Sequence, residues 1–194
     1  MDIISSIKEL DTDIFLFLNS KHTPFFDVVM AAASGKYTWI PLYAFLFFMV
    51  FRFVGKHIWL VALSAAVLIL ASDQLSVHLF KNVFLRYRPC HNLLIQNFIH
   101  LNGKCGGMYG FVSSHAANTF ALAMFLTLFF KNRINYFGIY IFLWACFVSY
   151  SRVYNGVHYP ADIAVGALLG MLIGWTIYKL YLAINLRLQR QELD

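Results

Sequence analysis

The sequence predicts an all-α fold, an integral membrane helical bundle of about five transmembrane helices preceded by short helices at the membrane interface. Composition is the first reason. Hydrophobic residues make up 60% of the chain and charged residues only 12%, whereas about 25% of the residues of an ordinary soluble domain are charged. The second reason is the presence of five mostly apolar runs, each close to the roughly 17 to 25 residues that cross a bilayer. At 194 residues, the chain is expected to form one domain.

Residues 1–36 are expected to lie at the interface as two short helices. Lys8, Glu9, Asp11 and Asp13 precede a short apolar run, where a secretory signal peptide would have a basic segment and a small-residue cleavage site. We therefore expect no signal peptide. The stretch TPFFDVVMAAASGK that follows is too short to span a bilayer, and its mixed character favours a helix at the interface or packed on the bundle.

Residues 38–183 are assigned to the transmembrane bundle and residues 184–194 to a polar cytoplasmic tail. The five expected spans are Thr38–Val54, His57–Phe80, Gly110–Phe130, Tyr136–Ser151 and Ala161–Ala183. None of them is free of polar groups, so the spans are expected to tilt or to carry a few polar side chains into the bundle.

The connections between these spans fall on two sides of the membrane. One side has the connections 52–56 and 131–135 and the tail, and the other has the N-terminal segment and the connections 81–108 and 152–160. Cytoplasmic loops carry an excess of Lys and Arg. The first side has seven such cations and the second has eight, or five if the cations of the functional site described below are left out. The functional side is then expected to face the periplasm or extracytoplasmic side of a bacterial inner membrane.

The net charge of +6 does not indicate nucleic acid as a partner. The basic residues are scattered through short loops, and no soluble basic face exists to carry them. Anionic lipid in the membrane bilayer is the expected partner instead.

The three cysteines cannot all pair with one another. Cys146 lies within an apolar run and is expected to be an inert packing residue. Cys90 and Cys105 both fall in the long polar connection, where an oxidising compartment would allow a disulfide. The sequence leaves open whether that disulfide forms.

Two cations mark the end of the second span. In KNVFLRYRP, Lys81 and Arg88 are seven residues apart, which is two turns of a helix and places both on nearly the same face. Pro89 stops the helix beside them. Both side chains can then point at one anion. The alternative is that they snorkel at the helix end and contact lipid phosphates in general.

A second polar cluster, VSSHAANTF at 112–120, opens the third span. Ser113 and Ser114 precede a helix-forming run, so hydroxyls and free backbone N–H groups at the helix start can meet an anion. His115 lies in the first turn. The alternatives are that Ser113 is simply the helix N-cap and that His115 is a polar residue at the interface.

A third cluster, SRVYNGVHYPAD at 151–162, precedes the last span. Arg152 can give a bidentate fork to phosphate oxygens, and His158 has a ring nitrogen able to attack phosphorus or shuttle a proton. Asp162 is the only acid in residues 74–191. It can hold the second imidazole nitrogen of His158. The alternative for Asp162 is an ion pair with Arg152.

Four other polar residues have less specific expectations. Asp73 lies within the second span, where an acid is costly, and it is expected to make a structural polar contact. Arg86 and Tyr87 are expected to face the loop or the lipid headgroups, and Lys104 is a candidate recognition cation.

Taken together, the patterns K-x6-R-P, S-x-H and S-R-x5-H-x3-D resemble the three-part signature of the type 2 phosphatidic acid phosphatase superfamily. The residues that match are Lys81, Arg88, Pro89, Ser113, His115, Ser151, Arg152, His158 and Asp162. The order, the spacing and the five-span layout all fit. The middle part departs from the usual P-S-G-H of the family, since residues 112–115 read V-S-S-H. Ser114 in place of glycine puts a Cβ where the backbone approaches the phosphate.

The resemblance implies metal-independent phosphoryl transfer without a cofactor. His158 would attack phosphorus to give a phosphohistidine while Asp162 holds its ring, and His115 would protonate the departing lipid oxygen and later help to activate water. The phosphate-binding residues would be Lys81, Arg88, Arg152, Ser113 and the backbone near Ser114. A general acid contributes about 10²–10⁴-fold, and loss of one preorganised charge-stabilising donor costs about 10²–10³-fold, so several such residues are needed together.

A membrane lipid phosphatase or diphosphatase is the favoured function. Vanadate-dependent haloperoxidases have a similar site, but they are soluble, and the five apolar runs argue against that reading. A non-enzymatic lipid-binding scaffold or transporter would need the cations but not the two histidines and Asp162. The favoured substrates are undecaprenyl diphosphate and lipid A phosphate, ahead of phosphatidylglycerophosphate and phosphatidic acid.

Overall fold

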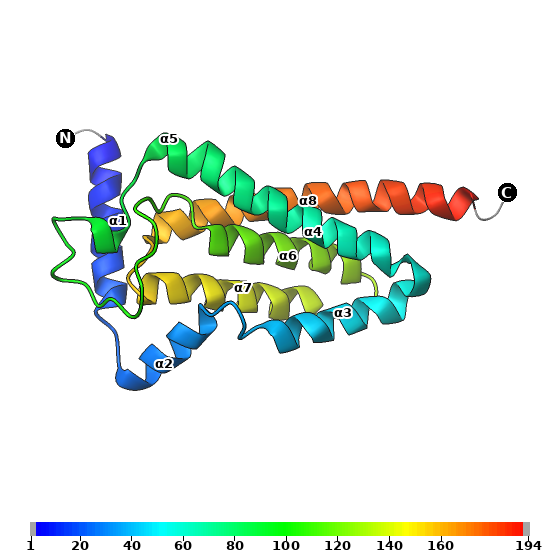
Figure 1. The fold of residues 1–194 in the computed structure, drawn as a ribbon, viewed down its shortest axis with the longest axis horizontal. Coiled ribbons are helices and arrows are strands. Elements are labelled where there is room, and N and C mark those ends of the chain that lie inside the picture. The colour runs from blue at the N-terminus through cyan, green and yellow to red at the C-terminus, as the bar shows by residue number, and fades with distance from the viewer. Residues whose placement is uncertain (1–2, 192–194) are drawn as a thin grey trace.

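The computed structural model describes residues 3–191, and its regular elements are helices (Figure 1). Five helices run roughly along the long axis of the molecule: α3 (Ile40–Val54), α4 (Ile58–Leu75), α6 (Ser114–Phe130), α7 (Phe137–Tyr154) and α8 (Pro160–Gln191). Many large apolar side chains on these helices face outwards, Phe48, Leu70 and Leu143 among them. A bundle with an apolar exterior is what a bilayer requires, and the predicted all-α membrane bundle is confirmed.

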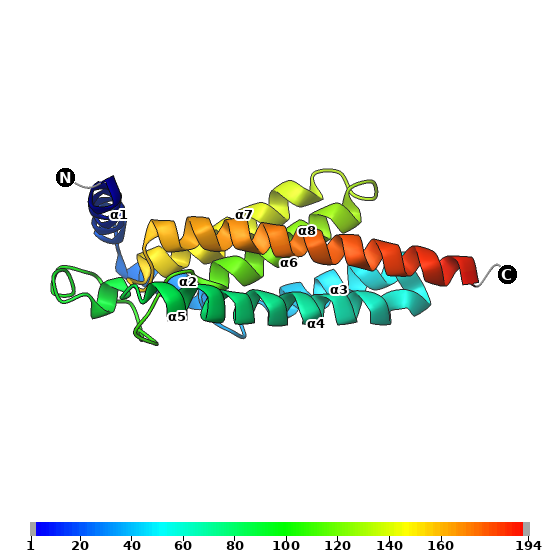
Figure 2. The same ribbon diagram turned by 90° about the horizontal axis from the view of Figure 1, so that it is seen from above.

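Within residues 3–191, three helical stretches are long and apolar enough to cross a membrane, namely Ile40–Phe84, Phe137–Tyr154 and Pro160–Gln191. The first comprises two helices, because the chain reverses direction at η1 (Gly55–His57), where α3 and α4 meet before they diverge (Figures 1 and 2). α6 has 17 residues and falls just short by length. The five predicted spans therefore correspond to five helices of the bundle.

α6 is the central helix, in contact with α4, α7 and α8. Small residues on both partners bring α6 and α8 close together. A Cβ atom at Gly170 or Gly174 of α8 would overlap the carbonyl oxygens of Ala117 and Ala121 of α6. Small residues at four-residue spacing allow this close backbone approach in membrane helices. It fixes the start of α8 against the start of α6.

Two short helices precede the bundle, as expected. α1 (Ile3–Asn19) lies across one end of it, and α2 (Pro24–Ala33) packs against α7 (Figure 1). The Asn19 side chain donates to the carbonyl oxygens of His100 and Tyr154. That contact ties the end of α1 to the long connection and to the end of α7. Residues 1–2 of the predicted interfacial segment lie outside the described residues.

The last helix is longer than the predicted span. α8 continues past Ala183 to Gln191 and projects beyond the other helices (Figure 2). Residues 184–191 contain neither Gly nor Pro and include good helix formers such as Leu, Arg and Gln, so nothing stops the helix at the expected boundary. Residues 192–194 of the predicted tail lie outside the described part of the chain.

The connection after α4 is more ordered than a plain loop. α4 continues through a π-helical turn, η2 (Ser76–Lys81), into α5 (Asn82–Phe84), and Leu85 in the left-handed region (φ 47°) ends the helix. Arg88 begins a 3₁₀ turn, η3 (Pro89–His91), and Cys90 forms a disulfide with Cys105. The structure thus resolves the question that the sequence left open for these two cysteines. Cys146, in contrast, is exposed on α7, so its assignment as a packing residue is wrong.

Candidate active site

All eight predicted site residues lie at the same end of the bundle, the left-hand end in Figure 1. They come from the end of η2, the following loop, the start of α6, the end of α7 and the turn into α8. Their side chains are buried or half-buried, and Ser113, His158 and Asp162 have at most 1% of their surface exposed. Segments that are far apart in the sequence therefore build one enclosed polar site inside an apolar molecule.

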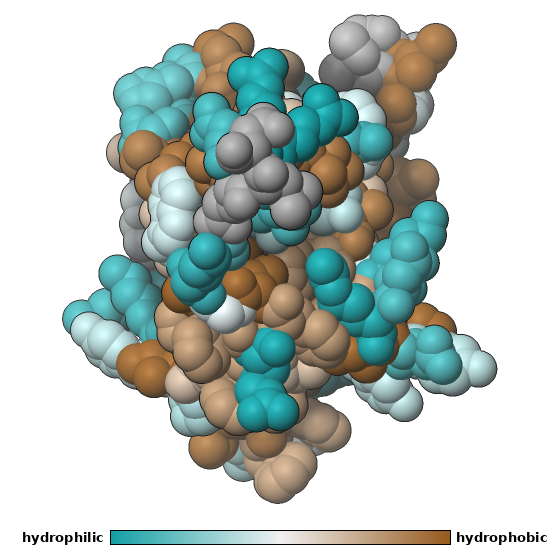
Figure 3. Space-filling model, turned by 90° about the vertical axis from the view of Figure 1, so that its right-hand side faces the viewer, coloured by the Kyte–Doolittle hydropathy of each residue, from teal (hydrophilic) through white to brown (hydrophobic). Residues whose placement is uncertain are grey.

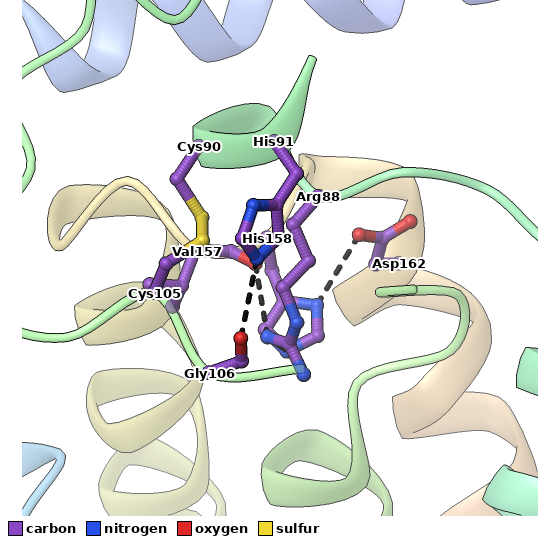
Figure 4. The surroundings of a disulfide bond; sticks show 8 residues. All are labelled: Arg88, Cys90, His91, Cys105, Gly106, Val157, His158 and Asp162. Atoms are coloured by element: carbon purple, nitrogen blue, oxygen red, sulfur yellow. Dashed lines mark hydrogen bonds and ion pairs between the residues drawn. A yellow bond between two sulfur atoms is a disulfide. The ribbon is translucent and has the colours of Figure 1, made fainter. Parts of the chain in front are cut away.

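His158 lies between a cation and a carboxylate (Figure 4). Its Nδ1 is 3.2 Å from Asp162 Oδ2, and its Nε2 is 2.9 Å from Arg88 Nη1. A guanidinium group only donates hydrogen bonds, so Nε2 accepts and carries the lone pair, while Nδ1 carries the hydrogen and donates to Asp162. This tautomer leaves Nε2 as the nucleophilic nitrogen.

The charge state of His158 follows from the same surroundings. Burial, and after it the positive charges of Arg88, Arg152 and Lys81, hold the pKa of His158 well below its ordinary value. The imidazole is therefore neutral at physiological pH. A neutral ring is the form that can attack an electrophile.

Asp162 has a partner that the sequence reasoning missed. Its Oδ1 accepts from Arg86 Nη1 at 2.9 Å, and the other arm of Arg86 lies 2.6 Å from Asp11 Oδ2 of α1. The guanidinium also stacks 4.0 Å above the Tyr159 ring. The expectation that Arg86 faces the loop or lipid headgroups is wrong, and Asp162 pairs with Arg86 instead of Arg152. Asp11 in turn accepts from the Ala161 backbone, so α1 and the start of α8 hold this arrangement in place.

The expected geometry of Lys81 and Arg88 is also corrected. Their convergence does not come from two turns of one helix, because the helix ends at Phe84. Tyr87 forms an isolated antiparallel bridge with Tyr109, so Arg86 and Arg88 flank an extended residue. Side chains two apart in extended chain share a face, and both arginines reach the His158–Asp162 pair. That alternation is the signal by which Arg86 could have been found.

Gly110 is a second residue that the sequence reasoning did not single out. A Cβ atom there would lie 3.0 Å from Arg88 Cγ, 3.2 Å from Asp162 Oδ2 and 3.5 Å from His158 Nδ1. A glycine lets the backbone after the disulfide loop lie this close over the pair, whereas any larger residue would require Arg88 or Asp162 to shift.

The side chain of Ser114 is engaged with Lys81. Lys81 Nζ donates to Ser114 Oγ at 2.7 Å, Ser114 Oγ lies 2.7 Å from Ser76 Oγ, and Ser76 Oγ lies 2.8 Å from the Asp73 carbonyl oxygen. An ammonium only donates and a carbonyl only accepts. The direction of every hydrogen bond in the chain is therefore fixed: Lys81 donates to Ser114, Ser114 donates to Ser76, and Ser76 donates to the carbonyl oxygen of residue 73. The π-helical turn makes this possible by placing Ser76 one such turn before Lys81.

This chain of hydrogen bonds bears on two predictions. Asp73 contributes its backbone carbonyl to a structural contact with Ser76, while its carboxylate is exposed. Ser114, which stands where the family usually has glycine, uses its hydroxyl to orient a cation. Its backbone N–H lies in the first turn of α6, where N–H groups have no partner within the helix and can bind an anion.

Ser113 takes the alternative role considered for it. Its side chain is the N-cap of α6, accepting from the Ala116 N–H, and its own N–H donates to the Asp162 carbonyl oxygen at 3.0 Å. His115 follows in the first turn, half-buried, and makes no side-chain hydrogen bond to any described residue. Its ring is thus available to a bound molecule.

Two buried donors at the site lack a partner. Arg88 Nε and Arg152 Nε are both shielded from solvent, and no described residue accepts a hydrogen bond from them. Buried polar groups are nearly always paired in folded proteins, and charged donors are especially costly to leave unpaired. Two guanidinium groups with unmet donors beside a neutral histidine are complementary to a multiply charged anion such as phosphate.

In the part of the chain that the structure describes, two other clusters have the residue types of a metal site, and neither has a suitable geometry. Cys90 and Cys105, beside His91, are joined as a disulfide. His22 and His100, with Asp27, form the second cluster, but their rings are stacked 3.8 Å apart and 3° from parallel. In-plane lone pairs of parallel rings do not converge on one ion. Asp27 also accepts hydrogen bonds from His100 and Tyr154, so its carboxylate is already part of a structural network.

A family model described as the PAP2 superfamily matches residues 61–185, a segment that includes all eight site residues. The chain belongs to the PAP2 superfamily. Two relatives of this PAP2 protein cover most of its length. The lipid A 4'-phosphatase of Bacteroides thetaiotaomicron is 37% identical over 96% of this chain and 84% of its own. The lipid A 4'-phosphatase of Porphyromonas gingivalis is 35% identical over 91% of this chain and 75% of its own.

The fold of this PAP2 protein is also found in a solved structure. A transmembrane PAP2-type phosphatidylglycerolphosphate phosphatase from Bacillus subtilis superposes with a TM-score of 0.70 at 19% identity, over 90% of this chain and 86% of that one. The predicted family and the predicted class of activity, a membrane lipid phosphatase, are confirmed.

Proposed function

We propose that this membrane lipid phosphatase removes a phosphate group from lipid A, with His158 as the nucleophile. The observation that carries the chemistry is the placement of His158, whose Nδ1 is held by Asp162 while its Nε2 lone pair faces the buried Arg88. The substrate class is supported by the two lipid A 4'-phosphatases that this chain resembles at 37% and 35% identity. These relatives favour lipid A over undecaprenyl diphosphate, phosphatidylglycerophosphate and phosphatidic acid.

In the first step, His158 Nε2 attacks the phosphorus atom, and the bond from phosphorus to the lipid oxygen breaks. Arg88 Nη1, which bonds Nε2 in the free enzyme, transfers its hydrogen bond to a phosphate oxygen. Once the phosphate dianion is bound, its negative charge favours the protonated form of His115, which gives its proton to the departing lipid oxygen. Asp162 stabilises the positive charge that develops on the His158 ring.

In the second step, water attacks the phosphohistidine. His115, now neutral, takes a proton from the water as the phosphorus–nitrogen bond breaks, and His158 returns to its starting tautomer. Lys81, Arg88, Arg152 and the first-turn amides of α6 hold the non-bridging oxygens throughout. Fixed donors of this kind, aimed at developing charge in a water-poor site, are each worth about 10²–10³-fold in rate.

The proposed location is a bacterial inner membrane, with the reacting end of the bundle facing the periplasm. Cations at the opposite end, including Arg52, Lys131 and Arg190, are exposed and suited to anionic headgroups of the cytoplasmic leaflet. Lipid A with its phosphate in the outer leaflet would then reach the site from within the membrane.

Phosphate release by detergent-purified protein tests the proposal. The panel comprises lipid A, undecaprenyl diphosphate, phosphatidylglycerophosphate and phosphatidic acid, all with EDTA present. We expect release from lipid A that His158→Ala abolishes. Faster release from another lipid would correct the substrate. Release that survives in His158→Ala, or that EDTA removes, would contradict the mechanism.

A further inference from the structure

A loop closed by a disulfide lies beside the reacting groups (Figure 4). Cys90 and Cys105, 15 residues apart in the sequence, form its covalent link. Two residues before Cys90, the Arg88 backbone N–H donates to the Met108 carbonyl oxygen at 3.1 Å. The disulfide and this hydrogen bond are therefore neighbouring links between the same two segments, and the second link belongs to a phosphate-binding residue of the site.

The first half of the loop is anchored to the body of the molecule without the disulfide. Ile95 is buried in an apolar cluster that includes Tyr159. Asn92 Nδ2 donates to the Tyr159 hydroxyl at 3.0 Å, and Asn102 Nδ2 donates to the Asp27 carbonyl oxygen at 2.7 Å. These contacts reach α2 and the turn before α8, so they do not depend on how the loop is closed.

The second half, the return segment of residues 103–108, has few such anchors. Three of its six residues are glycine, namely Gly103, Gly106 and Gly107. A Cβ atom at any of them would have no heavy atom within 4 Å, and glycine loses the most conformational freedom on ordering. Within the described residues, the hydrogen bonds of this segment are the one from Arg88 to Met108 and one between His91 Nε2 and the Gly106 carbonyl oxygen at 3.2 Å. The disulfide is its covalent restraint.

Arg88 depends on this restraint more than Arg86 does. The Arg86 guanidinium is held independently by two carboxylates. Arg88 Nη1 bonds the Val157 carbonyl oxygen and His158 Nε2, and in the proposed mechanism it releases His158 in order to hold a phosphate oxygen. During the reaction, the position of Arg88 therefore rests on the Val157 contact and on its own backbone, which the return segment holds.

We infer that the Cys90–Cys105 disulfide positions Arg88, so that the phosphatase is fully active only in its oxidised form. A dithiol reductant opens the bond: one thiolate attacks a cysteine sulfur, and the second thiolate then displaces that sulfur. Two electrons and two protons pass to Cys90 and Cys105, and the reductant becomes a disulfide. The freed return segment and Arg88 then populate more conformations. The inference rests on the proposed function, and it restricts full activity to an oxidising compartment such as the periplasm.

Reduction of the purified, folded protein tests this inference. Phosphate release from lipid A is measured before and after treatment with dithiothreitol, and again after reoxidation. We expect kcat to fall by about 10- to 100-fold on reduction, the range for loss of a group that orients an active residue, and to recover on reoxidation. Cys90→Ser combined with Cys105→Ser should show the lower rate with or without reductant. An unchanged kcat after both cysteines are shown to be reduced would overturn the inference.

Cys146→Ser is the matched control, because Cys146 is a free thiol exposed on α7. This variant should keep the full kcat and the full response to dithiothreitol. A Cys146→Ser protein that no longer responds would place the effect of the reductant at Cys146 and overturn the inference.

A second background shows whether the disulfide acts through Arg88. In Arg88→Ala, reduction should lower the remaining kcat by a clearly smaller factor than in the unaltered enzyme, because the effects of coupled groups do not add. A general loss of stability would lower kcat by the same factor in both proteins. Equal factors would therefore overturn the positioning role.

Chemical modification of His158 separates this inference from the proposed function. The His158 side chain is buried, with 1% of the residue exposed, and Arg88 bonds its Nε2. Diethyl pyrocarbonate reacts with accessible imidazole nitrogens, and mass spectrometry measures the extent of modification at His158. We expect faster modification when Cys90→Ser and Cys105→Ser are combined than in the unaltered protein, at a temperature at which both are folded.

Equal rates of modification would overturn the inference even if no lipid is hydrolysed. Absence of phosphate release from every lipid of the panel, with the oxidised protein folded, would count against the proposed function alone.

Discussion

Both ends of the bundle carry several cations, but within residues 3–191 the cations that are buried or half-buried lie at the reacting end. At the reacting end, Lys81, Arg88 and Arg152 are buried or half-buried and surround His158. At the opposite end, which faces the viewer in Figure 3, hydrophilic side chains project between hydrophobic ones. The exposed cations there include Arg52, Lys56, Lys131, Arg133, Arg187 and Arg190.

The difference teaches that burial, and not the number of charges, marks the anion site. In the sequence, the numbers of Lys and Arg on the two sides of the membrane, seven and eight, did not distinguish the two ends. In the structure, two guanidinium groups at one end have buried donors without a partner among the described residues, whereas the exposed cations at the other end can be solvated or contact headgroups. Substitutions at the two ends should therefore differ sharply in effect, and matched pairs can test the contrast.

The largest difference in kcat is expected between substitutions of two aspartates, the buried Asp162 and the exposed Asp73. Asp162→Asn would present an amide to His158 Nδ1, favouring the tautomer in which Nε2 carries the hydrogen and cannot attack. We expect kcat to fall by about 10²–10⁴-fold, in line with the same substitution in a serine protease triad. Asp73→Asn, which alters an exposed carboxylate on α4, should change kcat little. A comparable loss in both variants would show that the effect is on folding.

The next difference compares two arginines that each stack on aromatic rings. Arg86 lies 4.0 Å above Tyr159 and bonds Asp162 and Asp11, while Arg133 lies 4.5 Å above Phe129 at the other end. Arg86→Ala should lower kcat by about 10- to 100-fold, the loss typical of a group that orients an active residue. Arg133→Ala should leave kcat within about twofold. Equal kcat values for the two variants would refute a positioning role for Arg86.

The sequence predicted the reacting residues well, because their spacing within each cluster is local. Lys81, His115 and His158 all lie at the predicted end of the bundle, since the apolar runs fix which ends of the helices meet. The partners that cross the fold were harder to predict. Arg86 pairs with Asp11, 75 residues away, only because α1 lies across the end of the bundle, and no local pattern indicates that crossing.

Details of backbone geometry were equally out of reach. Residues 81–88 were expected to form one helix, but Leu85 in the left-handed region ends it early, and the π-helical turn that aligns Ser76 with Lys81 has no clear sequence signal. Cys146 was assigned to the interior because its neighbours are apolar. In a membrane protein that argument fails, since apolar residues face lipid as readily as they face the core.

A smaller effect is expected in the pH profile of kcat/KM, which reports groups of the free enzyme. Because burial and three nearby cations lower the pKa of His158, its ring stays neutral as the pH falls below 6.5. The acid limb that belongs to the nucleophile should therefore lie below pH 6.5. Arg152→Ala removes one of the cations and should move that limb to higher pH while lowering the overall rate. An acid limb that stays in place would contradict the assigned electrostatic coupling.

The smallest effect concerns the hydrogen-bond chain behind Lys81. Ser76→Ala removes its middle member, so Ser114 loses the acceptor for its hydrogen and holds Lys81 less firmly. KM should rise about 2- to 12-fold, the range of one net hydrogen bond, with kcat little changed. Ser72→Ala is the matched control, since Ser72 is equally buried on α4 and bonds only to the Leu68 carbonyl. Because Ser76 and Ser114 act through one chain, Ser76→Ala combined with Ser114→Gly should raise KM no more than the larger single effect. Additive increases would mean that the two serines act on Lys81 independently, and the directed chain would then be wrong.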